Sequence, residues 1–402
     1  MLLYIGMKYL VKFTDSNIQN TILNICILLF GINFLYKCNY IVMITFILLL
    51  FFKKFKISYQ NIVTLVILVL FAISWYIFTD GHEIAGVCLP ICYLIGSNID
   101  DKDEKGITKF ILLISMSLAF YTTLFFVNNA ITNGITSYDV YNQQNIWTGQ
   151  PLWATNIMLY SSLFFSCFGY VVFEEKDLKM KVLYFVIFII NAFYALMLGR
   201  RAALLMIILS FTFSFIYKVI IEDKDSRKKI FKLTIAICSL GIFLLVLLLI
   251  MFKTNAFGIK EIIKSTDLYV RFIRPHKIMY FFRDSGRMNI RINYFKHFFD
   301  YMWGGNVLRD IVGNYAHDLW LDVYDVAGIV SFVIIIIYSI IFVFDAVKIC
   351  TNKSISHAFR LFVICLFICI VSQMFLEPIL EACRAYMFGV CMIHGSLVLI
   401  KK

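Results

Sequence analysis

Charged residues are scarce in this chain of 402 residues: Asp, Glu, Lys and Arg together make up 15% of it, and it has only four prolines. A typical soluble domain has about 25% charged and about 45–50% apolar residues, whereas 61% of this chain is hydrophobic. These shortages exclude a water-soluble fold, a disordered chain and an ordinary nucleic-acid-binding domain. The composition therefore predicts an all-α polytopic membrane protein.

Motifs that hold metals or form disulfides are also missing. The eleven cysteines lie mainly in apolar runs, and no CxxC is followed by a second CxxC or by paired histidines. We therefore expect small buried hydrophobic residues rather than ligands or disulfides. Two Asp-x-Asp patterns, Asp101-Lys102-Asp103 and Asp223-Lys224-Asp225, have a metal-binding spacing. Both lie in lysine-rich loops, where a solvated turn of mixed charge is the simpler interpretation.

Long apolar runs make up most of the chain. At about 20 residues per spanning helix, they predict about 12 transmembrane helices, one of them (39–52) short for a bilayer. The predicted spans are 18–36, 39–52, 60–78, 84–99, 107–127, 152–173, 182–198, 202–221, 230–252, 326–347, 359–377 and 384–400. The expected organisation is transmembrane helices 1–9 in residues 1–252, one large outer loop in 253–325, and transmembrane helices 10–12 in 326–402.

The distribution of Lys and Arg predicts the orientation. With both termini inside, the inner segments hold 22 of these residues and the short outer loops hold four, namely Lys37, Arg200, Arg201 and Arg384. This asymmetry is the one expected of cytoplasmic termini. The large loop then lies on the outer face, where Lys253 to His317 carries eleven basic and five acidic residues.

Two arginine pairs on that face are candidate anion-binding groups. Arg200 and Arg201 follow Gly199 in a short corner between two spans, where ionisable groups usually serve a site. The alternative is snorkelling to lipid headgroups. Arg287 and Arg291 are one helical turn apart in the loop and project together; the alternative is a solvated helix face. Guanidinium groups suit phosphate and pyrophosphate oxygens.

The loop itself predicts an amphipathic helix. Residues 287–302 place apolar side chains on one face, and Trp303-Gly304-Gly305 ends the helix. We expect this face either to pack on the helix bundle or to lie in the membrane interface. The face consists of Met288, Ile292, Phe295, Phe299 and Met302.

His317 and Asp318, just before the tenth predicted span, are candidate catalytic residues. An imidazole with an ordinary pKa near 6.5 accepts a proton close to neutrality. Together with the arginines, it fits the attack of a sugar hydroxyl on an anomeric carbon whose leaving group is a lipid-linked pyrophosphate. The arginines then neutralise the leaving group, as a divalent metal does elsewhere.

The loop from Asn128 to Trp153 lacks Lys and Arg but is rich in aromatic residues. It is a candidate sugar-contacting surface, because aromatic faces bind sugars. The alternative is an interfacial aromatic belt. The residues concerned are Tyr138, Tyr141, Trp147 and Trp153.

These motifs resemble the superfamily of O-antigen polymerases and O-antigen ligases. Residues 199–205 resemble its Gly-Ser-Arg-x-Ala-Leu-Leu corner, and Ser285-Gly286-Arg287 with Trp303-Gly304-Gly305 resembles its loop helix and Gly-rich turn. His317-Asp318-Leu319-Trp320-Leu321, followed by Gly328, resembles the closing His-Asn-x-x-Leu stretch. The resemblance covers about residues 190 to 345. This chain departs from the family's pattern at three positions. It has Arg200 where the family usually has Ser, Arg291 where Trp is frequent, and Asp318 where Asn is frequent.

The resemblance implies a GT-C-like, metal-independent, inverting glycosyltransferase that uses undecaprenyl-pyrophosphate-linked sugars. Arg201 and Arg287 would contact the pyrophosphate, with Arg200 and Arg291 adding charge. His317, alone or with Asp318, would act on the acceptor hydroxyl.

The function expected from the resemblance is polymerisation of lipid-linked repeat units into O-antigen or a related polysaccharide, at the periplasmic face of a bacterial inner membrane. Ligation of finished glycan to lipid A core or another acceptor is the alternative. A flippase or other transporter is disfavoured, because the predicted spans carry almost no charge at their centres. Expected partners are the lipid-linked oligosaccharides, membrane lipids and, as one option, a chain-length regulator, but not nucleic acid; no cofactor is expected.

Overall fold

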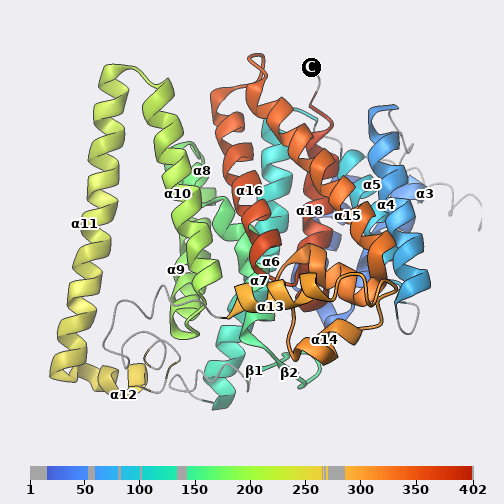
Figure 1. The fold of residues 1–402 in the computed structure, drawn as a ribbon. Helices are drawn as coiled ribbons and strands as arrows, with labels where there is room; N and C mark the ends of the chain where they lie inside the picture. Colours follow the sequence, from blue (N-terminus) through green and yellow to red (C-terminus); the bar gives the residue numbers. More distant parts are fainter. Residues whose placement is uncertain are drawn as a thin grey trace, which may run out of the picture. The chain divides into compact units, whose positions relative to one another are not determined.

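The computed structural model describes residues 16–52, 59–79, 83–99, 102–133, 143–264, 266, 269 and 286–400. These residues are almost entirely helical (Figure 1). The helices are α2 (Ser16–Gly31), α3 (Cys38–Phe52), α4 (Tyr59–Phe78), α5 (Ala85–Ser97), α6 (Glu104–Asn133), α7 (Ala154–Ser166), α8 (Phe168–Phe173), α9 (Leu178–Met197), α10 (Arg201–Ile221), α11 (Lys224–Thr254), α12 (Ile259–Lys264), α13 (Arg287–Lys296), α14 (Val307–Val312), α15 (Leu319–Thr351), α16 (His357–Leu376), α17 (Ile379–Ala382) and α18 (Arg384–Leu397).

The remaining elements are small. Two 3-10 turns lie at Phe34–Tyr36 and Ala256–Gly258. Strands β1 (Gln143–Gln144) and β2 (Pro151–Leu152) form an antiparallel hairpin, so the expectation of a purely α fold misses one short element. Within the loop predicted to contact sugar, Trp153 is exposed and Trp147 is half-buried. Tyr138 and Tyr141 lie outside the described residues.

The expectation of a helical fold is confirmed for the described residues, whereas the expected dozen spans are not confirmed. Seven helical segments among the described residues are long and apolar enough to cross a membrane. They are Asn61–Phe78, Glu104–Thr132, Ala154–Phe173, Leu178–Met197, Arg201–Ile221, Leu319–Thr351 and His357–Leu376. Three shorter apolar helices lie at Thr21–Gly31, Cys38–Phe51 and Ala85–Ser97.

The chain divides into two compact units that do not follow chain order. The first consists of Met1–Tyr121, Gly286–Ser356 and Ser372–Lys402, and the second of Thr122–Ser285 and His357–Val371. The first unit therefore combines the N-terminal helices with most of the C-terminal part of the chain. The three consecutive segments expected from the sequence describe the order of apolar runs rather than these units.

In the first unit, α5 and α18 approach each other closely because glycines lie at their contact. A Cβ atom on Gly96 would lie 1.9 Å from the carbonyl oxygen of Met392, and one on Gly395 would lie 2.1 Å from that of Tyr93. Small residues of this kind let helix backbones come together in membrane proteins. Helix α5 has only 13 residues and contains Pro90. The close approach of α18 explains why α5 is nevertheless buried along most of its length.

We predict that Gly96→Ala destabilises the protein, because the added methyl group must displace the backbone of α18. Overpacking of this kind costs about 1–3 kcal/mol or more. The matched control is Gly241→Ala in α11, where a Cβ would meet nothing within 4 Å and helix propensity favours alanine by about 0.5–1 kcal/mol. Thermal unfolding in detergent measures both, and equal midpoints for the two variants would argue against the close contact.

The second unit is held together partly by polar side chains between helices. The Ser210 hydroxyl of α10 donates to the Ser166 carbonyl at 2.7 Å and accepts from the Gly169 amide at 2.9 Å. In α9, Asn191 donates to the Thr123 hydroxyl at 2.9 Å and accepts from the Ser161 hydroxyl at 2.6 Å. Such bonds satisfy polar groups between apolar helices.

The two Asp-x-Asp patterns contain helix-capping residues. The Asp223 carboxylate accepts from the Ser226 amide at 3.0 Å and caps α11. Asp103 accepts from the Gly106 amide at 2.8 Å at the start of α6, whereas Asp101 lies outside the described residues. Capping by Asp is a common local role, so these contacts favour the solvated-turn interpretation.

The predicted loop helix is shorter than expected, and its packing face is different. Helix α13 ends at Lys296, and a turn follows in which the Asp300 amide donates to the His297 carbonyl at 3.1 Å. The buried residue of α13 is Tyr294, which is not on the predicted apolar face. Of the two expectations for this apolar face, packing on the bundle is contradicted, since its side chains are exposed, and a position in the membrane interface stays a prediction.

Candidate functional site

The segment before His317 is fixed to α15 by a pair of glycines. Gly328 interrupts α15 with φ 73° and ψ −176°, a conformation open almost only to glycine. The freed Ile329 amide donates to the Met302 carbonyl at 2.8 Å, and the Gly305 amide donates to the Val326 carbonyl at 3.2 Å. A Cβ on Gly304 would lie 2.7 Å from that same Val326 oxygen. The Gly-rich turn predicted to end the loop helix thus docks on the break in α15.

A small hydrophobic core packs against the segment that leads to His317. It consists of Tyr294, Leu308, Ala316, Leu321 and Tyr324. The Phe298 ring stacks on Tyr324 with centroids 4.1 Å apart, and the Tyr294 hydroxyl donates to the Asn314 carbonyl at 3.0 Å. The backbone leading to His317 is therefore anchored to both α13 and α15.

His317 has an unusual backbone and a buried, unpaired nitrogen. Its φ of 57° lies in the left-handed region, which is uncommon for non-glycine residues and often marks functional sites. The Nδ1 atom is buried and has no hydrogen-bond partner among the described residues. Burial, with the charges of Arg287 and Arg291, lowers the pKa of His317 to about 4. The imidazole is therefore neutral near pH 7 and retains a free lone pair.

Asp318 pairs with arginine rather than with the histidine ring. One carboxylate oxygen accepts from the Leu321 amide at 2.8 Å and caps α15, and the other pairs with Arg291 Nε at 3.1 Å. Burial raises the pKa of Asp318 above its ordinary value. Among the described contacts none joins its carboxylate to the His317 ring. The described contacts therefore leave the His317 ring without a direct carboxylate partner in Asp318.

Arg291 holds the backbone around His317. Its guanidinium donates to the carbonyls of Ala316 at 3.3 Å and His317 at 2.8 Å, and also to the carbonyl of Phe375. With the Asp318 ion pair, these contacts link α13, the histidine and the end of α16. Arg291 is therefore a positioning residue, and its predicted contact with pyrophosphate remains a prediction.

Arg287 makes fewer contacts with the rest of the protein than Arg291 does. One of its terminal nitrogens donates to the Leu376 carbonyl at 2.6 Å, and the other lies 3.4 Å from a Glu377 carboxylate oxygen. It begins α13 directly after Gly286, which has φ 78°, so the partial positive charge of the helix N-terminus adds to its own. Ser285, the first residue of the expected Ser-Gly-Arg motif, lies outside the described residues.

The predicted arginine corner is present in the second unit. Helix α9 ends at Met197 and α10 begins at Arg201, with Gly199 at φ 60° making the turn. Arg200 is half-buried and donates to the Thr155 hydroxyl at 2.7 Å. The short connection expected from the sequence is thus confirmed. The assignment of Arg200 and Arg201 to the pyrophosphate remains a prediction.

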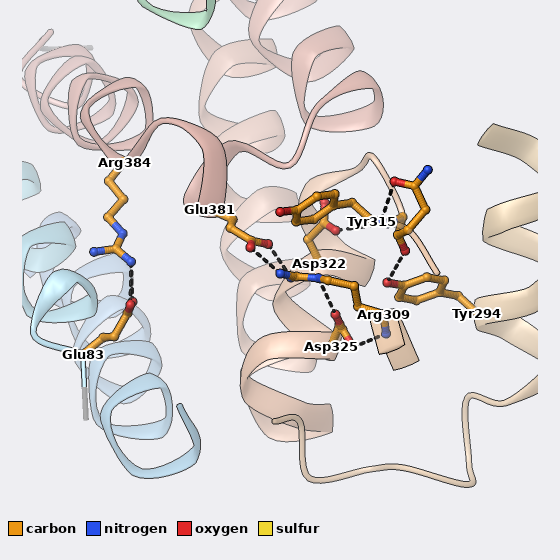
Figure 2. A network of polar contacts seen from close by, with 10 residues as sticks. Glu83, Tyr294, Arg309, Tyr315, Asp322, Asp325, Glu381 and Arg384 are labelled. Atoms are coloured by element: carbon orange, nitrogen blue, oxygen red, sulfur yellow. Dashed lines mark hydrogen bonds and ion pairs between the residues drawn. The ribbon is translucent and has the colours of Figure 1, made fainter. Parts of the chain in front are cut away.

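The sequence did not predict a polar network centred on Arg309 of α14 (Figure 2). Its two terminal nitrogens each lie 2.5 Å from an oxygen of Glu381 in α17. Its amide donates to Asp325 at 3.1 Å, and its guanidinium lies over the Tyr315 ring at 4.1 Å. Burial by itself lowers the pKa of Arg309, but the Glu381 carboxylate more than reverses this and raises it overall.

Three arginines of the loop therefore contact one short segment, residues 375–381. Arg291 contacts the Phe375 carbonyl, Arg287 contacts Glu377, and Arg309 contacts Glu381. A sequence search for cations alone misses the two glutamates. The signal that could have found them is a pair of carboxylates, Glu377 at the end of the eleventh predicted span and Glu381 in the connection after it, on the same predicted side as a basic loop.

We predict that Arg309→Met strongly destabilises the first unit. Removing one partner of a largely buried ion pair leaves an uncompensated charge, at a cost of about 3–5 kcal/mol. The double variant Arg309→Met/Glu381→Met is expected to recover part of this loss, because an apolar pair often replaces a buried ion pair at little cost. Unfolding midpoints measure both, and a double variant less stable than the single one would contradict the pairing.

The sequence matches no model of a known protein family, and no curated protein matches it either. The first unit presents an imidazole with a buried nitrogen that has no partner among the described residues, a guanidinium bound to the His317 carbonyl, and the positive charges of Arg287 and Arg291, which lower the pKa of the ring. Such a site can accept a proton from a hydroxyl and bind an anion beside it.

Proposed function

We propose that the protein is a membrane glycosyltransferase that polymerises oligosaccharide repeat units carried on a polyprenyl pyrophosphate. The observation that carries the proposal is the buried Nδ1 of His317, which has no partner among the described residues, together with Arg291 bound to the His317 carbonyl at 2.8 Å and the charges of Arg287 and Arg291 that lower the pKa of the ring. A neutral imidazole next to permanent cations suits a reaction in which a hydroxyl loses a proton while a phosphate-bearing group departs. The GT-C-like fold, the periplasmic location, the cytoplasmic termini and the metal-independent mechanism are parts of this proposal.

In the proposed step, the acceptor hydroxyl oxygen attacks the anomeric carbon of the donor glycan. The bond from that carbon to the pyrophosphate oxygen breaks, and the lipid pyrophosphate leaves with the bonding electrons. The hydroxyl proton passes to His317. Arg287 stabilises the charge that develops on the departing pyrophosphate, and attack from the opposite side inverts the anomeric centre.

Substrate binding would make His317 a stronger base. In the free protein, burial and the charges of Arg287 and Arg291 keep the pKa of His317 at about 4. A bound pyrophosphate adds negative charge next to these arginines, and nearby negative charge favours the protonated imidazole. The same ligand that supplies the leaving group would thus raise the basicity that the reaction requires.

Ligation of finished glycan to lipid A core or another acceptor is the alternative within the same chemistry. The residues around His317 act on a hydroxyl and a pyrophosphate, and both reactions have these groups in common. A polymerase-deficient strain retains single repeat units on its surface glycan, whereas a ligase-deficient strain retains none. The banding pattern of that glycan therefore distinguishes the two.

The experiment that tests the proposal compares surface glycan in a strain that lacks the protein with the same strain complemented by wild type or by His317→Ala. We expect long chains with wild type, single repeats without the protein, and a strong reduction of long chains with His317→Ala. His297→Ala, an exposed residue that pairs with Asp300 at 2.9 Å, is the matched control and should retain long chains. Long-chain glycan in the strain lacking the protein would overturn the proposal.

A further inference from the structure

Helix α13 and the turn that follows it leave a stripe of large apolar side chains uncovered. We refer to Met288, Ile292, Phe295, Phe299 and Trp303 as the apolar stripe. Their exposed fractions range from 45% for Ile292 to 75% for Phe299. Large contiguous apolar surfaces on a protein usually mark an interaction site.

The stripe is one of three distinct faces of the same short segment. A second face packs against the protein through Ile290, Tyr294 and Phe298. The third face is exposed and polar, and consists of Asn289, Asn293, Lys296 and Asp300. The two exposed faces therefore differ sharply in polarity, although they lie side by side on the helix. A helix with this pattern is suited to a boundary between an apolar medium and water.

The apolar stripe adjoins the apolar surface of two candidate membrane spans. Trp303 stacks on Phe78, the last residue of α4, with centroids 5.7 Å apart. Next to it, Met302 accepts a hydrogen bond from Ile329 of α15, and the neighbouring side chains Val330 and Val333 are exposed. On α4, Ile77 is likewise exposed. The stripe thus continues the exposed apolar sides of α4 and α15.

We propose that the apolar stripe inserts into the phospholipid bilayer, so that α13 lies along the membrane surface with its polar face toward water. The occupant is lipid, because the stripe is continuous with apolar surfaces that a membrane must cover and is bordered by a polar face on its other side. This inference does not depend on the proposed enzymatic activity. One consequence is that Arg287, at the start of α13, lies near the depth of lipid phosphate groups.

Photocrosslinking in lipid nanodiscs tests the inference. The photoreactive residue p-benzoylphenylalanine replaces Phe295 on the apolar stripe or, as the matched control one helical position away from Ile292, Asn293 on the polar face. Nanodiscs made of phosphatidylethanolamine and phosphatidylglycerol supply the lipid. Mass spectrometry of the irradiated protein identifies lipid adducts and protein adducts.

We expect at least fivefold more phospholipid adduct from position 295 than from position 293. Equal adduct yields at the two positions would overturn the inference, as would a product of doubled protein mass at position 295, which indicates a second copy of the chain. Because both positions are exposed, neither replacement requires repacking. Crosslinking at Phe299 repeats the test at a second residue of the stripe and should give the same preference for lipid.

Discussion

Replacing His317 with alanine is expected to lower the rate of glycan transfer by about 10²–10⁴-fold, the usual contribution of a general base. The side chain is the only part of His317 that the substitution removes, and its Nδ1 makes no hydrogen bond within the described residues. The fold should therefore survive, because the contacts of Arg291 in this region go to backbone carbonyls and to Asp318. Transfer of a synthetic polyprenyl-pyrophosphate oligosaccharide by purified protein measures the loss.

The pH dependence of glycan transfer tests separately whether His317 is the base. The neutral imidazole is the active form, and the pKa of His317 in the free protein is about 4. The ratio kcat/KM, which reports the free enzyme, should therefore stay level down to about pH 5 and fall as pH drops through about 4. His317→Gln should remove this acidic limb. An unchanged rate in His317→Ala, or an acidic limb that persists in it, would show that another group is the base.

Replacing Arg287 with glutamine is expected to lower transfer by about 10²–10³-fold, the range seen when one donor to a developing anion is removed. Arg287 makes one close hydrogen bond, to the Leu376 carbonyl, and a longer contact to Glu377. Its guanidinium can therefore turn toward a bound pyrophosphate more easily than that of Arg291. Arg287→Lys should recover only part of the rate, because lysine keeps the charge but loses the planar fork.

Arg291→Lys is the matched comparison for Arg287. Because Arg291 bridges the carbonyls of Ala316, His317 and Phe375, its replacement should lower thermal stability as well as the transfer rate. Arg287→Gln keeps an amide donor for the Leu376 carbonyl but loses the charge that faces the buried Glu377, so it should lower the rate with a smaller fall in the unfolding midpoint than Arg291→Lys. If the two arginines behaved alike in both assays, their separate roles would be contradicted.

The helices could be predicted from the sequence, because long apolar runs dictate them directly. Each of the twelve predicted spans falls on helical residues, although within the described parts of the chain seven helical segments reach a membrane-spanning length and hydropathy. The extent of α13 could not be predicted in the same way. Its apolar periodicity continues to Met302, but the chain leaves the helix after Lys296, and Phe298 then stacks on Tyr324.

The grouping of Arg291 with His317 could also be predicted, whereas the glutamates that pair with the loop arginines could not. Arg287, Arg291 and His317 are close enough in sequence for motif spacing to connect them. Glu377 and Glu381 lie far along the chain from the arginines that they pair with. Only the tertiary fold brings such groups together, so a single sequence carries no local signal for the pairing. The role of Gly328 as a docking point for the turn at Gly304 is hidden for the same reason.

The most direct test of the account is to titrate His317 by NMR in protein labelled with ¹⁵N-histidine, with and without inorganic pyrophosphate. His317→Gln assigns the signal. The account predicts a pKa of about 4 in the free protein and a clear rise when pyrophosphate binds, with the rise lost in Arg287→Gln. A histidine that titrates near its ordinary value and does not respond to pyrophosphate would contradict the claim that His317 lies beside a pyrophosphate site.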